Sequence, residues 1–187
     1  VSILFFQLRK GSSFLLVKKL GITNEFMKLV PVAALFGIVL LFFHQLYGIG
    51  YNTINEVLNH HYSLAFVLAL LALKLFFMAL FLEAGSYGGT FAPSLMIGVL
   101  LGHSFAVLAN ALFATSLDPI VFALVGMGGV LAGINAIPLT SILLVFEVTG
   151  DYHFILPLMF VSIIAYLVVI YVNRGGTYAL ELMKEGI

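Results

Sequence analysis

The sequence predicts an all-α membrane protein of several broken and tilted helices, and three observations predict this fold class. Hydrophobic residues make up 63% of the 187 residues and charged residues only 9%, against about 25% charged in soluble domains. Uncharged stretches cover 29–55, 84–117, 119–146 and 152–173, and a helix crosses a bilayer with about 20 residues. No stretch alternates as barrel strands do, and backbone groups must pair within lipid, so these stretches are predicted helices.

Composition also disfavours several functions. The formal net charge is +0, which leaves no basic surface for nucleic acid, and the absence of cysteine removes disulfide and thiolate chemistry. The polar residues of the spans, such as Ser94, His103 and Ser104, form no catalytic set, so we do not expect an enzyme. His60 and His61 have no third ligand near them in sequence, which disfavours a metal site. We therefore expect no cofactor.

The first segment is read as the end of a membrane helix over 1–8, followed by a basic interfacial connector over 9–28. Val1 lies inside an apolar run without the features of a leader peptide, so we expect the chain to start in mid-protein. Positive residues cluster before the first long span and again after the last one. The positive-inside rule places both groups, and hence the C-terminus, on the cytoplasmic side of what we expect to be the cell membrane.

The remaining elements follow in order. A span is predicted over 29–43 with Pro31 in its first turn, then a glycine turn over 48–51. A helix over 62–82 carries Lys74 in its interior, where a charge faces protein or water. Lys74 is either a functional group or a structural partner of Glu83 or of a helix end. The last predicted helices cover 91–112, 119–131, 138–148 and 154–172, and several are short enough to end partway through the membrane.

A glycine-rich break holds the most informative residues. Gly85, Gly88 and Gly89 precede a helix that we expect to open near Pro93. The start of a helix has unpaired N–H groups and the positive end of its dipole. The backbone amides of Thr90, Phe91 and Ala92 are therefore candidates for an anion site without a full positive charge. The alternative is that the glycines only let helices pack closely.

Three later features leave alternatives open. The glycines of 126–133 fit close helix packing. Glu147 at the end of an apolar run is an interfacial carboxylate or a proton carrier, and the first is favoured because few other buried titratable groups are present. Tyr178 follows another glycine break, where its hydroxyl either donates to an anion or belongs to an interfacial aromatic belt.

Five sequence blocks belong together. They are Gly-Ile-Gly-Tyr-Asn-Thr-Ile at 48–54, Gly-Gly-Thr-Phe-Ala-Pro at 88–93, Gly-Met-Gly-Gly-Val-Leu-Ala at 126–132, Pro-Leu-Thr-Ser at 138–141 with Glu-Val-Thr at 147–149, and Thr-Tyr-Ala-Leu at 177–180. In order and spacing these blocks resemble the CLC family of voltage-gated chloride channels and proton/chloride antiporters. The match extends over nearly the whole chain.

The resemblance implies a homodimer in a lipid bilayer that moves chloride, and possibly protons, with one anion pathway per subunit. Thr90 and Phe91 would give backbone amides to the anion with Ala92 close by, and Tyr178 would give its hydroxyl, which replaces the belt interpretation. The segments 138–147 and 154–172 would lie at the dimer interface, which makes Glu147 structural.

The same resemblance implies that residues 1–187 are a partial pore domain, the second inverted repeat plus the final pore helix. The family's first repeat, with its serine loop and gating glutamate, and any CBS domains have no counterpart in this sequence. Tyr87 in the glycine-rich segment and Glu83 before it depart from the family pattern. Two alternatives remain, a fluoride exporter of the same family and a membrane scaffold that transports nothing.

Overall fold

A computed structural model describes residues 2–13, 25–48, 50–59, 62–86, 89–150, 152–173 and 176–177, and no strand occurs among them. The helices are α1 (Ser2–Ser13), α2 (Glu25–Phe42), α3 (Tyr51–Leu58), α4 (Leu64–Glu83), α5 (Phe91–Phe113), α6 (Pro119–Asn135), α7 (Pro138–Thr149) and α8 (Ile155–Asn173). Two 3₁₀ turns, η2 (His44–Leu46) and η3 (Tyr152–Phe154), join helices. The predicted all-α class is confirmed.

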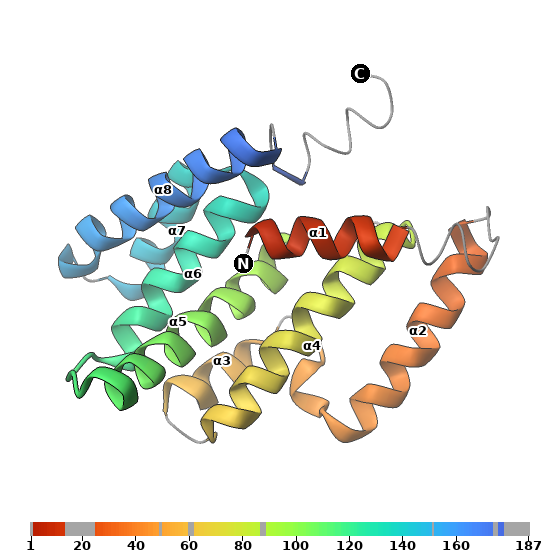
Figure 1. Cartoon of the computed structure of the whole chain (residues 1–187), viewed down its shortest axis with the longest axis horizontal. Helices are drawn as coiled ribbons and strands as arrows, with labels where there is room; N and C mark the ends of the chain where they lie inside the picture. Colours follow the sequence, from red (N-terminus) through yellow and green to blue (C-terminus); the bar gives the residue numbers. More distant parts are fainter. Residues whose placement is uncertain are drawn as a thin grey trace.

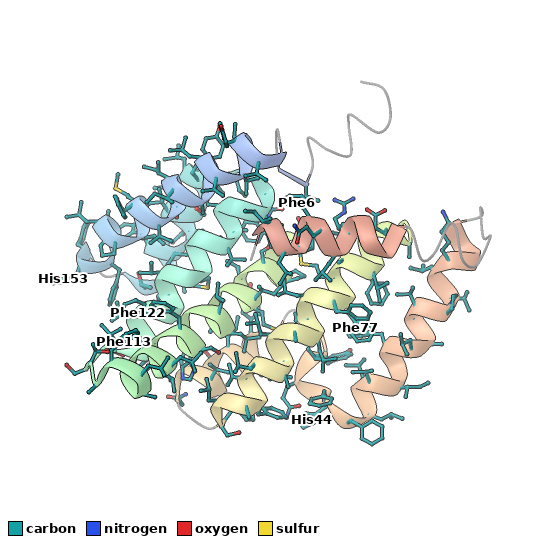
Figure 2. All side chains as sticks on the ribbon, viewed as in Figure 1. Phe6, His44, Phe77, Phe113, Phe122 and His153 are labelled. Atoms are coloured by element: carbon teal, nitrogen blue, oxygen red, sulfur yellow. The ribbon has the colours of Figure 1, made fainter. Side chains whose placement is uncertain are left out.

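The helices α4, α5 and α6 lie side by side in the middle of the molecule (Figure 1). The pair α7 and α8 packs on the far side of α6, whereas α2 packs on α4 at the opposite edge. The first helix, α1, crosses this row and contacts α4, α6 and α8. One hydrophobic core joins the central helices, and a smaller cluster between α2 and α4 is built on Val32, Phe77, Leu80 and Ala84. Figure 2 shows Phe77 on the side of α4 that faces α2.

Among the residues that the structure describes, three helical segments are by length and composition apolar enough to cross a membrane, namely Leu64–Glu83, Phe91–Phe113 and Tyr152–Val172. The apolar helices Lys28–Phe42, Pro119–Asn135 and Pro138–Thr149 are shorter. This mixture matches the sequence-based expectation that some helices end partway through the bilayer.

The contact between α5 and α6 depends on glycines at which the two backbones nearly touch. A Cβ built on Gly98 would lie 2.5 Å from the carbonyl oxygen of Gly126, and one built on Gly102 would lie 1.9 Å from the carbonyl oxygen of Phe122. A side chain at either position would force the helices apart. The packing interpretation of the 126–133 glycines is therefore correct for Gly126.

Two sequence expectations need correction. Pro31 lies inside α2, which begins at Glu25, and not in its first turn. A proline removes one helical hydrogen bond, and a long apolar helix can continue through that loss. The structure also contains α3, a short helix that the sequence analysis did not predict. It starts after Gly50, whose φ of +84° suits glycine, and buries Thr53, Ile54 and Val57 on one face.

Candidate functional site

The glycine-rich segment begins with a sharp end to α4. Gly85 has a φ of +82°, which places it in the left-handed region that favours glycine. The Ser86 amide donates to the carbonyl oxygen of Phe81 at 3.0 Å, and the Gly85 amide donates to that of Leu82 at 3.3 Å. This pair of bonds is the Schellman arrangement, which satisfies the last carbonyls of a helix and turns the chain away from its axis. Tyr87 and Gly88 lie outside the described residues.

The helix α5 opens immediately after this segment, at Phe91, where the helix predicted over 91–112 also begins. Thr90 is the N-cap with φ −80° and ψ −12°, and no side chain caps the helix. The first intrahelical bond runs from the Ser94 amide to the carbonyl oxygen of Thr90, at 3.1 Å. Pro93 has no N–H to offer. Phe91 and Ala92 are thus the first two residues of α5, where amides have no partner within the helix.

Three buried polar side chains form a closed ring of hydrogen bonds beneath this helix start. The Thr90 hydroxyl donates to Oδ1 of Asn135. Asn135 Nδ2 donates to Oγ of Ser94 at 3.4 Å, and the Ser94 hydroxyl donates to the carbonyl oxygen of Thr90 at 2.6 Å. All three residues are at most 4% exposed. Since Asn135 is the last residue of α6, the ring joins the end of α6 to the start of α5.

Residues 176 and 177, which follow α8 in the chain, lie beside this ring of hydrogen bonds. The Thr177 hydroxyl donates to the carbonyl oxygen of Ile134 at 2.9 Å. A Cβ built on Gly176 would lie 2.6 Å from the carbonyl carbon and oxygen of Asn135, so glycine permits this approach. Residues 176 and 177 therefore lie against the last turn of α6, next to the Thr90–Asn135 contact. Tyr178 itself lies outside the described residues.

A cavity of about 290 Å³ lies between α2, α4 and the start of α5. Its lining includes Ser86, Gly89, Thr90 and Pro93 from the glycine-rich segment and Lys74 from α4. Aromatic and aliphatic side chains supply most of the remaining wall. The four residues of the segment thus share one cavity with a full positive charge, which contrasts with the expectation of a site built from dipoles alone.

Lys74 is 7% exposed and is held by backbone carbonyls. Its Nζ donates to the carbonyl oxygens of Leu46 at 3.0 Å and Gly48 at 3.1 Å. Leu46 ends η2, so the expectation that Lys74 partners a helix end is confirmed for this contact. The expectation that it pairs with Glu83 is wrong, because Glu83 forms its ion pair with Arg9 of α1. Arg9 is therefore a buried helical residue and not part of an exposed basic connector.

The sequence analysis missed Asn135 altogether and considered Ser94 only as a possible member of a catalytic set, which it rejected. A signal for Asn135 was present, because it is the one polar residue in the segment 119–135.

Glu147 is exposed near the end of α7, in line with the preferred interfacial interpretation. Among the described residues, no group of three or more His, Asp or Glu side chains is placed to hold a metal, and His60 and His61 lie outside those residues.

Comparison with known proteins gives a consistent result. The sequence profile described as "Voltage gated chloride channel" matches residues 1–169. The chain is 37% identical over 138 residues to the H(+)/Cl(-) exchange transporter ClcA of Vibrio campbellii, covering 73% of this chain and 30% of the relative. It is 33% identical over 154 residues to ClcA of Citrobacter koseri, covering 82% of this chain and 33% of that relative.

Solved structures share the fold. A slow cyanobacterial Cl⁻/H⁺ antiporter superposes with a TM-score of 0.82 at 24% identity, over 98% of this chain and 44% of its own. A eukaryotic CLC transporter superposes with a TM-score of 0.77 at 27% identity, over 98% of this chain and 32% of its own. The chain spans about a third of the length of the curated relatives it matches.

Proposed function

Since the chain belongs to the voltage-gated chloride channel family, an integral membrane family, we propose that it forms part of the chloride pathway of a membrane transporter. The observation that carries the proposal is the start of α5, a helix N-terminus without a side-chain cap that opens beside a cavity. The named relatives are transporters, so we propose transport and no catalytic reaction.

In this proposal, the anion is held by the backbone N–H groups of Thr90, Phe91 and Ala92. Amides at a helix N-terminus bind anions through hydrogen bonds and the helix dipole. Gly89 carries no Cβ, and nothing lies within 4 Å of where a Cβ would stand, so an ion can come close to the backbone. Moderate binding by partial charges suits conduction, because the ion must also leave.

The neighbouring Lys74 adds a long-range attraction. Its ammonium already donates to two carbonyls, which disperses part of its charge. We propose that it attracts anions into the cavity and that the amides of α5 bind them. Lys74 and Thr90 line the same cavity, and Phe91 and Ala92 follow Thr90 directly at the start of α5.

Tyr178 completes the proposed site through its phenolic hydroxyl. Supporting this role, Gly176 and Thr177 lie against the last turn of α6, whose Asn135 also contacts Thr90. Thr177, the residue before Tyr178 in the sequence, therefore lies near the start of α5.

We further propose a homodimer that exchanges chloride for protons across the cell membrane, with a cytoplasmic C-terminus. Relatives named as H(+)/Cl(-) exchange transporters favour coupled exchange and favour chloride over fluoride. Exposed apolar side chains on α7 and α8, among them Leu139, Leu143 and Phe160, offer a surface for a second copy. The basic residues of the chain favour the stated orientation.

The decisive experiment removes one amide without changing a side chain. In the intact protein reconstituted into liposomes, an amide-to-ester replacement at Phe91 deletes the N–H. We expect the apparent affinity for chloride to fall about ten- to a hundredfold, the size of one hydrogen bond to a charged group, with a smaller change in maximal efflux. The matched control is the ester at Leu139, an exposed residue in the first turn of α7, away from the cavity.

Chloride efflux that is unchanged by the Phe91 ester would contradict the proposed site. A wild-type protein that moves no chloride would contradict the proposed function itself. A simultaneous record of proton movement decides between exchange and passive flow.

A further inference from the structure

The hydroxyl of Thr90 does not behave as that of an ordinary N-cap residue. A capping threonine takes extended backbone angles and accepts a hydrogen bond from the N–H of the second or third helical residue. Thr90 instead has φ −80° and ψ −12°, and no side-chain cap is formed. The third helical residue is Pro93, which has no N–H, so the Ala92 amide is the one group that such a cap would consume.

Asn135 accounts for this behaviour. Its Oδ1 accepts the Thr90 hydroxyl, which aims the threonine side chain toward the end of α6. Its Nδ2 donates to Ser94 Oγ, and the Ser94 hydroxyl in turn donates to the Thr90 carbonyl oxygen. Each hydroxyl in the ring donates once, so the bonds are mutually compatible. With Asn135 4% exposed, Thr90 2% and Ser94 0%, water does not compete for these groups.

We infer that Asn135 is a positioning residue for the anion site. It holds the Thr90 hydroxyl away from the helix end, which leaves the Ala92 amide, next to that of Phe91, available to the ion. It also fixes the start of α5 against the last turn of α6, where Gly176 and Thr177 dock. Asn135 thereby sets the distance between the amides and residues 176 and 177. The inference rests on the proposed function of α5 as an anion site.

Substitutions of Asn135 and Thr90 test this in the intact protein reconstituted into liposomes. Asn135→Leu removes the two atoms that Asn135 contributes to the ring, the acceptor Oδ1 and the donor Nδ2. Thr90→Val removes the Thr90 hydroxyl and keeps the shape of the side chain. We expect either change to weaken the apparent chloride affinity about three- to tenfold, with maximal efflux less affected. Thr90→Ser keeps the hydroxyl and should recover most of the affinity lost in Thr90→Val, because the bond to Asn135 can still form.

The two residues should act as a unit. The double variant Asn135→Leu/Thr90→Val should be no worse than the more affected single variant, since partners in one contact are not additive. Fully additive losses would overturn the coupling.

A matched control exists on the same helix. Ser104 is as buried as Ser94, and its hydroxyl donates to the carbonyl oxygen of Leu100, four residues earlier, at 2.7 Å. Ser94→Ala should weaken the affinity for chloride, whereas Ser104→Ala should change stability without changing affinity. Equal effects of the two alanine variants on affinity would overturn the positioning role.

Amide hydrogen exchange separates the inferred positioning role of Asn135 from the proposed function in chloride transport. Amide hydrogen exchange over residues 89–95 should speed up in Asn135→Leu and remain as in wild type in Thr90→Ser and Ser104→Ala. Unchanged exchange in Asn135→Leu overturns the positioning role, whatever the transport result. Absence of chloride efflux from the wild-type protein overturns the proposed function instead, so the two failures are distinguishable.

Discussion

Arg9 of α1 and Glu83, the last residue of α4, form an ion pair in which Nε lies 2.9 Å from Oε1. The two side chains are 7% and 8% exposed, so solvent screens the pair little. Glu83 stands two residues before Gly85, the glycine of positive φ that follows the end of α4. The pair therefore fastens the first helix of the chain to the beginning of the glycine-rich segment.

Breaking this pair should destabilise the fold strongly. Glu83→Leu leaves the Arg9 cation buried without its carboxylate, and we expect the free energy of unfolding to fall by about 3–5 kcal/mol. Denaturant unfolding in detergent measures the change. The double variant Arg9→Met/Glu83→Leu removes both charges and should recover most of the loss. Equal stability of the single and double variants would refute this account of the pair.

Lys74 should contribute to stability through the two carbonyls that it binds. Lys74→Met leaves the Leu46 and Gly48 carbonyls without this donor, and we expect a loss of about 2 kcal/mol. Faster hydrogen exchange of the segment 44–48 should accompany the loss. Lys74→Arg keeps a cation with several donors and serves as the control, with a smaller change. Wild-type exchange in Lys74→Met would show that the contact does not hold this turn.

The contact between α5 and α6 should tolerate no side chain at its closest point. Gly102→Ala would place a methyl group 1.9 Å from the Phe122 carbonyl oxygen, and we expect a destabilisation of about 3 kcal/mol or more. Gly37→Ala is the matched control, because nothing lies within 4 Å of its built Cβ inside α2. It should be neutral or stabilising by up to about 1 kcal/mol, since alanine favours the helix. Comparable melting temperatures for the two variants would refute the close approach.

Tyr62 precedes α4, and its hydroxyl donates to Oε2 of Glu56. Burial raises the pKa of Tyr62 above its usual 10.0, and the hydrogen bond to Glu56 raises it further. The raised pKa means that the folded state holds this proton more tightly than the unfolded state. The resulting stability is present below pH 10 and is lost as the pH rises through the folded pKa.

Ultraviolet titration of tyrosinate, with Tyr62→Phe to assign the signal, measures this pKa. In Glu56→Gln the pKa should fall toward the usual value without reaching it, because the burial remains. An unchanged titration in Glu56→Gln would show that the carboxylate has no part in the shift.

Much of the fold was accessible from local patterns. The helices around Lys74, Phe91, Pro119 and Pro138 were predicted within a few residues of their observed bounds, because proline, glycine and charged residues mark helix ends. The short helix at Tyr51 was missed because it is eight residues long, whereas helical periodicity is assessed over windows of about 11 to 18 residues. The start of α2 was misplaced because proline is common in the first turn of a helix, and the chain uses it inside one instead.

The sequence alone therefore determined the class of the protein, the break at 85–90 and the residues whose amides begin α5. Only the tertiary structure decided which groups meet there. It brought Asn135 to Thr90, Lys74 to the carbonyls of the 44–48 turn, and Arg9 to Glu83. The physical reason is the sequence separation of the interacting residues. Hydropathy and helix ends depend on neighbours along the chain. The hydrogen bond between Thr90 and Asn135 joins residues 45 positions apart, so it depends on how the helices pack.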